Sequence, residues 1–369
     1  MSLTSLQVTV DDIDLTSIGL TGDWPATPRW LSESLARSLA SDPDGLVARC
    51  QQTHQLGLLE SALRADQLWE RVPVAARQRI RQQNAVVAIL TRTLWRSADE
   101  INRVCRAAGI RPVFLKGICS SLMYYEQPYE RPFKDIDMLV ASEDTANIVA
   151  LLSGLSYVAL VYDRRAHALV EPTRGPANDG RYELAPLWKI VPVKLDQSLD
   201  ADLAGYDGPL LRVSDDHAFV PVCVEVHFAL NPDNQIPWAR ASWTSGPIGE
   251  ADCLDAETQL LYTTYKAYID LIIRRNAPSV KLACDAVRIA SRNAGSIEWE
   301  RLRRAAHDCG MCGPLRYMCF HASRHLGAAG DVEPLGCCDC TGDDYGKLEV
   351  GDLLPHLLRY RTPFSLQPI

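Results

Sequence analysis

The sequence lacks the features that mark membrane proteins and non-specific nucleic-acid binders. No apolar run approaches the roughly 20 residues that a membrane-spanning helix needs. Acidic residues outnumber basic ones, 46 Asp and Glu against 38 Lys and Arg, so the formal net charge is −8. The basic excess that supplies most of the affinity for nucleic acid and anionic membranes is therefore missing. We expect no membrane partner, and we do not favour nucleic acid as a partner.

Other absences limit the cellular setting. The N-terminal stretch lacks the basic start and continuous apolar core of a signal peptide, so we expect a cytoplasmic protein. Cysteine is not scarce, with 12 in 369 residues, and in that setting free thiols are favoured over a disulfide framework. One group has enough thiols for a structural zinc ion, but its spacing matches no familiar zinc pattern, so free thiols are favoured. Its members are Cys309, Cys312, Cys337, Cys338 and Cys340.

Hydrophobic spacing divides the chain into helical and mixed regions. Apolar residues recur every three or four positions before Gly109, which is a plausible C-cap. Short apolar runs that read as strands, including 157–163, then alternate with helical patterns such as 143–155, and a second helical region follows. The expected regions are a loosely ordered N-terminus (1–25), a helical region (26–109), an α/β core (110–250) with an insertion (164–220), a helical domain (251–327) and a Cys-, Gly- and Pro-rich tail (328–369).

Two aspartates interrupt the apolar run "DIDMLV", residues 135–140, which reads as a buried strand. Side chains at i and i+2 of a strand project from the same face, so Asp135 and Asp137 point together while Ile136 and Met138 point into a core. Two neighbouring carboxylates repel each other unless a cation neutralises them. Mg²⁺ prefers such oxygen ligands, so the pair predicts a metal site.

A later strand, "VCVEVHF", carries a further acid in an apolar setting. Glu225 shares one face of this strand with Cys223 and His227, while valines occupy the other face. We expect Glu225 to be the third carboxylate, on a strand beside the aspartates. His227 has two open interpretations, a buried core histidine or a contact to substrate phosphate.

The segment "FLKGICSS" passes from a strand through Lys116 and Gly117 into a helix. Such a turn offers backbone N–H groups and a helix N-terminus to phosphate. Lys116 adds a positive charge, and Ser120 and Ser121 offer hydroxyl groups. We therefore expect a phosphate-binding turn, against the alternative that Lys116 forms an ordinary ion pair.

The ordered set "FLKG", "YERPFKDIDMLV" and "VEVHFAL" resembles the uncharacterised nucleotidyltransferase family of the polymerase β-like superfamily, over roughly residues 85–327. The resemblance implies an α+β fold, in which a mixed sheet with flanking helices lies between helical N- and C-terminal regions. It also implies that Asp135, Asp137 and Glu225 bind one or two Mg²⁺ ions, with Glu225 as ligand or general base. Lys116 and Gly117 would form the triphosphate-binding turn, which is usually Gly-Ser or Gly-Gly in this superfamily.

The expected activity follows from the resemblance. A nucleoside triphosphate, ATP most readily, would give its nucleoside monophosphate to a hydroxyl of a small-molecule or protein acceptor and release pyrophosphate. Two alternatives stay open. One is a non-catalytic nucleotide-binding module that keeps a degenerate fold, and the other is a metal-dependent phosphotransferase or nucleotide hydrolase.

Further residues are candidates for binding nucleotide or acceptor. Arg131 and Lys134 flank the aspartates and either neutralise phosphate or form ion pairs. Lys281 is a candidate nucleotide contact by resemblance, although its spacing from Asp285 favours a surface ion pair on a helix. Within the insertion, three residues are placed where an acceptor could dock. They are Tyr182, Glu183 and Trp188.

Overall fold

We describe a computed structural model of the chain. It describes residues 29–172, 182–195, 203, 206–208, 210–230, 236, 243–245, 251–274, 276, 279–293 and 295–315. Among the helices of these residues, none combines the length and apolar character needed to cross a bilayer.

The N-terminal part is helical, as predicted. Asp42 begins α3 by accepting a hydrogen bond from the Gly45 N–H, and Pro43 occupies the first turn, where its missing N–H costs nothing. The longest helix, α5, ends next to Gly109, whose φ of +79° suits the glycine expected after a helix. The helices are α2 (Arg29–Ser41), α3 (Pro43–Gln52), α4 (Leu56–Ala65) and α5 (Val74–Ala107).

A mixed sheet forms the centre of the molecule, in the strand order β6-β7-β8-β2-β1-β10-β9, with β5 also paired to β8. Strand β2 runs parallel to β8 and antiparallel to β1, and β1 runs parallel to β10. The strands are β1 (Val113–Phe114), β2 (Asp135–Leu139), β5 (Leu187–Lys194), β6 (Asp207–Gly208), β7 (Leu211–Ser214), β8 (His217–His227), β9 (Trp243–Ser245) and β10 (Asp252–Leu254).

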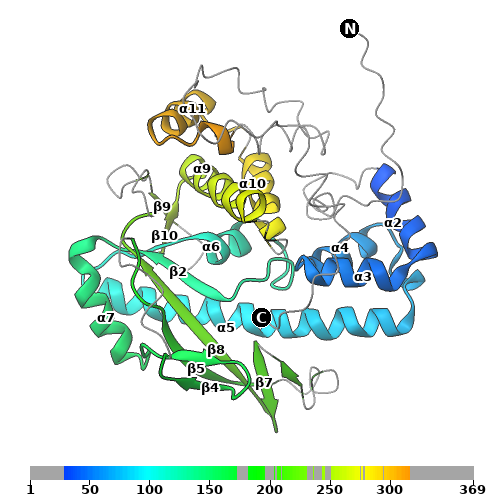
Figure 1. Cartoon of the computed structure of the whole chain (residues 1–369), viewed down its shortest axis with the longest axis horizontal. Helices are drawn as coiled ribbons and strands as arrows, with labels where there is room; N and C mark the ends of the chain where they lie inside the picture. The colour runs from blue at the N-terminus through cyan, green and yellow to red at the C-terminus, as the bar shows by residue number, and fades with distance from the viewer. Residues whose placement is uncertain are drawn as a thin grey trace.

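One face of this sheet is closed by α5. Ile136 and Met138 of β2 and Val224 of β8 are fully buried, in one hydrophobic cluster with α5 residues such as Leu90. The predicted alternation is therefore confirmed, because the apolar members of both strands point toward α5. Figure 1 shows α5 running along one side of the sheet, with α7 (Thr145–Gly154) beside it. The carboxylates face away from α5.

Helices from both ends of the described chain pack together on the other side. The C-terminal helices lie across the sheet from α5 in Figure 1, and they share a hydrophobic cluster with α2, α3 and α4. A buried contact from Gln55 Nε2 to Cys284 Sγ, at 3.5 Å, links α4's N-cap to α10. The C-terminal elements are α9 (Ala256–Ala267), the π-helix η4 (Tyr268–Ile273), α10 (Val280–Arg292) and α11 (Trp299–Asp308).

The predicted fold class is confirmed: a mixed sheet with flanking helices lies between helical regions. One predicted strand differs from expectation. Of residues 157–163, only β3 (Val161–Asp163) is a strand, and it pairs with β4 (Ala168–Val170) in a separate two-stranded sheet. The predicted domain boundaries remain predictions, and the tail 328–369 lies outside the described residues.

Candidate active site

The carboxylates meet at adjacent strands. Asp137 of β2 lies directly opposite Glu225 of β8, and Asp135 lies opposite Cys223. Parallel pairing in this register puts all these side chains on one face of the sheet, as the sequence predicted. The Asp137 side chain is 3% exposed and that of Glu225 is 28% exposed. The site is therefore partly open, with its deepest carboxylate at Asp137.

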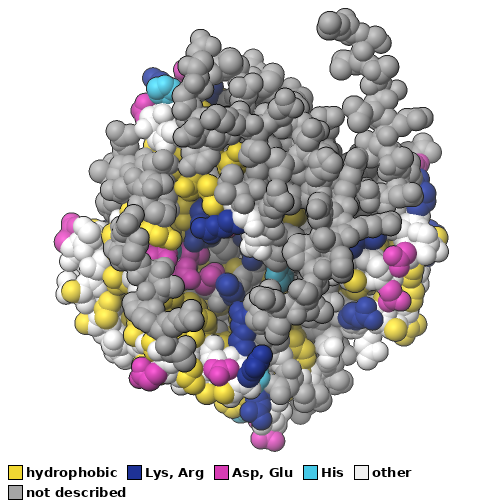
Figure 2. Space-filling model, in the orientation of Figure 1, with side chains coloured by type: hydrophobic (Ala, Val, Ile, Leu, Met, Phe, Trp, Pro, Cys, Tyr) yellow, Lys and Arg dark blue, Asp and Glu magenta, His cyan; other side chains and the backbone are white. Residues whose placement is uncertain are grey.

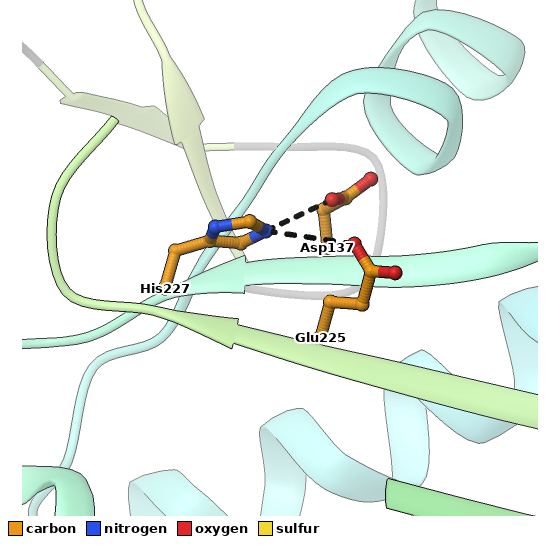
Figure 3. A group of neighbouring side chains, drawn as sticks. All are labelled: Asp137, Glu225 and His227. Carbon is orange, nitrogen blue, oxygen red and sulfur yellow. Dashed lines mark hydrogen bonds and ion pairs between the residues drawn. The ribbon is translucent and has the colours of Figure 1, made fainter. Parts of the chain in front are cut away.

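His227 completes a convergent group with these two carboxylates. Its Nε2 lies 3.0 Å from Asp137 Oδ1 and 4.0 Å from Glu225 Oε2 (Figure 3). One ligand atom from each of the three residues falls within 4.8 Å of the others, so together they could hold a metal ion. The sequence had instead indicated Asp135, Asp137 and Glu225 as ligands, and had left His227 open between a buried core histidine and a phosphate contact. Asp135 is on the same face but outside this group.

Burial and neighbouring charges shift the pKa values of the three carboxylates in different directions. Burial, and then Asp137 and Asp135, raise the pKa of Glu225 to about 8. Burial and Asp137 also raise the pKa of Asp135. For Asp137, burial is outweighed by Lys116 and His227, which hold its pKa well below the usual range. Burial and the two neighbouring carboxylates thus favour the protonated form of Glu225, and a bound cation would favour the ionised form instead.

Lys116 reaches the carboxylates instead of lying free at a turn. Its Nζ lies 2.5 Å from Asp137 Oδ1. Burial lowers the pKa of Lys116, but Asp137, Tyr262, Glu225 and Asp135 together outweigh burial and hold that pKa well above its ordinary value. The buried hydroxyl of Tyr262 on α9 also faces this ammonium. The ordinary ion pair named as an alternative is therefore present in this structure.

The backbone conformation of the Lys116–Gly117 turn depends on the lysine. Lys116, not Gly117, has the left-handed conformation, with φ of +47°. Gly117 lies inside α6 (Lys116–Met123), where a Cβ would come within 2.5 Å of the Phe133 Cβ. A left-handed non-glycine residue is uncommon and is often found at functional sites. Glycine is needed here for close packing rather than for turn geometry.

Ser120 and Ser121 are buried inside α6, at 0% and 2% exposure. The Ser121 hydroxyl donates to the Ile118 carbonyl and accepts from Trp95 Nε1 at 3.0 Å. These contacts hold Ser121 toward the protein interior. A phosphate contact by either serine remains a prediction that this geometry does not favour.

Arg131 forms an ion pair with a residue far along the chain. Its Nε and Nη2 contact the Asp285 carboxylate at 2.7 and 2.6 Å, and both side chains are almost fully buried. Asp285 also accepts a hydrogen bond from the Tyr125 hydroxyl. The predicted surface pair between Lys281 and Asp285 is therefore wrong, because Asp285 is buried and forms its ion pair with Arg131. The sequence offered both roles for Arg131, and in this structure it is an ion-pair partner.

Several lysines surround the carboxylates. Lys134 is exposed beside Asp135, and Lys281 donates to the Pro132 carbonyl at 3.3 Å. Burial and Arg131 lower the pKa of Lys281 to about 8, while Asp135 partly offsets them. Lys266 on α9 was missed by the sequence analysis, and burial and Lys116 lower its pKa. Its only sequence signal is its place four residues after Tyr262 in α9. Figure 2 shows Lys and Arg side chains on either side of an acidic recess near the middle of this face.

Two of the three candidate acceptor residues lie at the site. Tyr182 stacks on His227, with ring centroids 5.9 Å apart, and Glu183 Oε2 lies 3.2 Å from His227 Nδ1. Trp188 belongs to β5, opposite Cys223, and stacks on Tyr162 with ring centroids 6.0 Å apart. The insertion therefore returns to the carboxylates at 182–184.

The predicted zinc alternative falls largely on undescribed residues. Cys309 and Cys312 are buried, whereas Cys337, Cys338 and Cys340 lie outside the described residues. Within the part of the chain that the structure describes, the metal-compatible group of His, Cys, Asp and Glu is the one at Asp137.

Comparison with known proteins agrees with this geometry. No curated protein and no solved structure matches the chain. A family model described as "Uncharacterised nucleotidyltransferase" matches residues 40–327, which is most of the chain and includes every element that builds the site. The chain therefore belongs to this nucleotidyltransferase family, as its motifs predicted.

Proposed function

We propose that the protein transfers the nucleoside monophosphate of an NTP, ATP most readily, to a hydroxyl group of a small-molecule or protein acceptor. Pyrophosphate is the second product. The observation that carries this proposal is the direct pairing of Asp137 with Glu225 on adjacent strands, with Asp135 on the same face. Membership of a nucleotidyltransferase family supports the same reaction class.

The donor set fits a divalent cation. Asp137 and Glu225 offer oxygens that converge, and a cation there would offset the part of the raised Glu225 pKa that comes from Asp137 and Asp135 after burial. In this proposal Asp135, Asp137 and Glu225 hold the cation, which by family resemblance is Mg²⁺. When bound, the cation neutralises the charge of the triphosphate.

The chain supplies further positive charge for the phosphates. Lys116, Lys266 and Lys281 come from three helices and influence one another or the aspartates electrostatically. We assign the triphosphate to these lysines, with the exposed Lys134 at the rim. Phosphoryl transfer depends mainly on positioning and charge neutralisation, so such a set is sufficient.

The acceptor side of the site lies at Glu225 and the 182–188 segment. Glu225 is also the candidate general base by family resemblance: once a bound cation neutralises the site and Glu225 is ionised, its carboxylate can take the proton of an acceptor hydroxyl. Tyr182 and Glu183 lie against His227, so an acceptor beside Glu225 would contact them; Trp188 is farther along β5. The acidic net charge favours a small molecule or protein over nucleic acid.

The test is calorimetric titration of each NTP, with MgCl₂ and separately with MnCl₂, into wild type and the Asp135→Asn/Asp137→Asn double variant. Asp99→Asn, on the exposed face of α5, is the matched control. The proposal expects cation-dependent binding of one NTP to wild type and to the control, lost in the double variant. Absence of NTP binding to wild type would contradict the transferase proposal. The protein would then have the fold of the family without binding the family's substrate.

Product analysis then separates the remaining alternatives. The expected products, with the bound NTP and an acceptor library, are pyrophosphate and an acceptor that carries a nucleoside monophosphate. Release of orthophosphate and nucleoside diphosphate would instead identify a hydrolase, and transfer of the terminal phosphate would identify a phosphotransferase.

A further inference from the structure

A nitrogen ligand lies in a site that is otherwise lined by oxygen. His227 is 2% exposed, and its Nε2 points at Asp137 Oδ1 and Glu225 Oε2, 3.0 and 4.0 Å away (Figure 3). An imidazole buried this deeply beside two carboxylates has few roles open to it. It either bridges them through a proton or binds the cation that they bind.

The other side of the ring is held by the insertion. Glu183 Oε2 lies 3.2 Å from His227 Nδ1, the nitrogen on the far side of the ring from Asp137, but without hydrogen-bond geometry, so among the described residues Nδ1 is a buried atom with no hydrogen-bond partner. Tyr182 stacks on the ring, and the Phe228 N–H donates to the Tyr182 carbonyl at 2.9 Å. A carboxylate on this side of the ring is the usual support of a metal-bound imidazole, and Glu183 is near enough to take that role when Nδ1 carries the proton.

Metal chemistry distinguishes the two kinds of cation. Mg²⁺ is a hard ion that takes oxygen ligands and keeps several waters. Imidazole suits Fe²⁺, Ni²⁺, Cu²⁺ and Zn²⁺ in particular, and the affinity of a given nitrogen and oxygen site rises from Mn²⁺ to Cu²⁺ and falls again at Zn²⁺. The third ligand of the convergent group, the His227 imidazole, is therefore the kind of ligand that Mg²⁺ uses least.

We propose that the site selects a first-row transition dication over Mg²⁺, with His227 Nε2 as a ligand and Glu183 as the positioning residue beside its ring. Mn²⁺, the weakest binder of that series, is the paramagnetic probe for it. The proposal rests on the proposed function and replaces the Mg²⁺ that family resemblance implies for the same site. The cation would take the place of the hydrogen bond between His227 Nε2 and Asp137 Oδ1, any proton on Nε2 would leave to solvent, and the neutral ring would carry its proton on Nδ1, toward Glu183.

The test measures the cation alone, without nucleotide. Mn²⁺-loaded wild type is examined by electron spin-echo modulation, which detects a nitrogen bound to the ion. Mn²⁺ and Mg²⁺ affinities are measured by competition calorimetry. We expect nitrogen modulation and Mn²⁺ binding at least tenfold tighter than Mg²⁺ binding. Growth with ¹⁵N-histidine should change the modulation, which tests the imidazole without any substitution.

Variants then identify which histidine is involved. In His227→Gln the modulation should be lost and Mn²⁺ affinity should fall about 10–100-fold, the usual range when metal-site support is removed, with Mg²⁺ affinity changed less than threefold. Glu183→Gln should keep the modulation but weaken Mn²⁺ binding about tenfold. His217→Gln, at the other end of β8, should match wild type.

The outcomes separate this inference from the proposed function. Mn²⁺ bound without nitrogen modulation, or an unchanged Mn²⁺ to Mg²⁺ ratio in a folded His227→Gln variant, would overturn the inference. NTP binding that depends on Asp137 would then still support the transferase. If wild type binds neither cation, both the inference and the cation site of the proposed function fail.

Discussion

Arg131 and Asp285 form a buried two-point ion pair across 154 residues of sequence, with Nη2–Oδ2 at 2.6 Å and Nε–Oδ1 at 2.7 Å. The pair joins the loop that leads into β2 to helix α10. Arg288 reinforces the same junction by donating to the Tyr124 carbonyl at 2.9 Å. The start of the aspartate strand is thus anchored by the C-terminal helices.

The first prediction concerns this ion pair. Asp285→Ala should lower the free energy of unfolding by about 3–5 kcal/mol, because it leaves a buried guanidinium without its partner. Chemical denaturation followed by circular dichroism measures the change. Asp99→Ala removes an exposed ion pair with Arg103 and should cost only about 0.5 kcal/mol. Equal losses in the two variants would contradict the structural role of Asp285.

The second prediction concerns close packing under the Lys116 turn. Gly117→Ala puts a methyl group within 2.5 Å of the Phe133 Cβ and should cost about 1–3 kcal/mol of stability. Gly154→Ala is the control, because its new Cβ meets nothing within 4 Å. Thermal unfolding should show a clear loss in the first variant and no loss in the second. An unaffected Gly117→Ala protein would show that this packing is looser than described.

The third prediction is that replacing Lys116 changes the affinity for the cation and the affinity for the triphosphate in opposite directions. Lys116 competes with a cation for Asp137, which its Nζ contacts at 2.5 Å, and adds positive charge for phosphate. Lys116→Met should therefore bind divalent cation alone more tightly but bind the triphosphate less tightly, each by about tenfold. Calorimetry measures both affinities. Lys194→Met removes an exposed lysine of β5 and should change neither.

A parallel fall of both affinities in Lys116→Met would contradict this prediction. It would mean that Lys116 mainly holds Asp137 in place, and that its ammonium does not compete with the cation.

The fourth prediction is a pH dependence of nucleotide affinity. Burial and Arg131 lower the pKa of Lys281 to about 8 in the free protein. If this ammonium binds the triphosphate, affinity should be constant below that pKa and fall as pH rises above it, by up to about tenfold per unit. Lys281→Arg stays charged and should flatten the profile between pH 8 and 10. Identical profiles for the two proteins would place Lys281 away from the phosphates.

The lowered pKa of Lys281 also predicts the direction in which protein stability changes with pH. The unfolded chain has an ordinary lysine pKa near 10.5, whereas the folded chain holds Lys281 near 8. Between these values the unfolded state binds more protons, so the Lys281 contribution to stability rises with pH. Lys281→Met should remove that rise in denaturation curves taken from pH 8 to 10, and Lys194→Met should retain it.

Local patterns predicted the strands that carry the carboxylates. Period-two alternation placed Asp135 and Asp137 on one face and placed Glu225 and His227 on one face of another strand, and both alternations are present. The helical periods of α5 and α7 were also correct. Strand β10, Asp252–Leu254, is only three residues long, too short to show a period. The strand predicted over 157–163 is shorter than expected, Val161–Asp163, and it pairs with the nearby β4.

Long-range contacts decided the roles of the charged side chains. Nothing near Arg131 in the sequence points to Asp285, and the spacing of Lys281 and Asp285 suggested a different pair. The Lys116 turn depends on Phe133, which packs against Gly117 from the loop before β2. Such partners are found only when the fold is known, because burial and geometry select among many possible ion pairs.

The sequence by itself determined the strand faces, the order of the motifs and the family, because side-chain period and motif order are local properties of the chain. Tertiary structure decided which atoms meet. It placed Asp137 opposite Glu225, put Lys116 on Asp137 rather than at a free turn, and set His227 between Asp137 and Glu183. Those contacts depend on strand register and on the return of the insertion, and both follow from how the whole core packs.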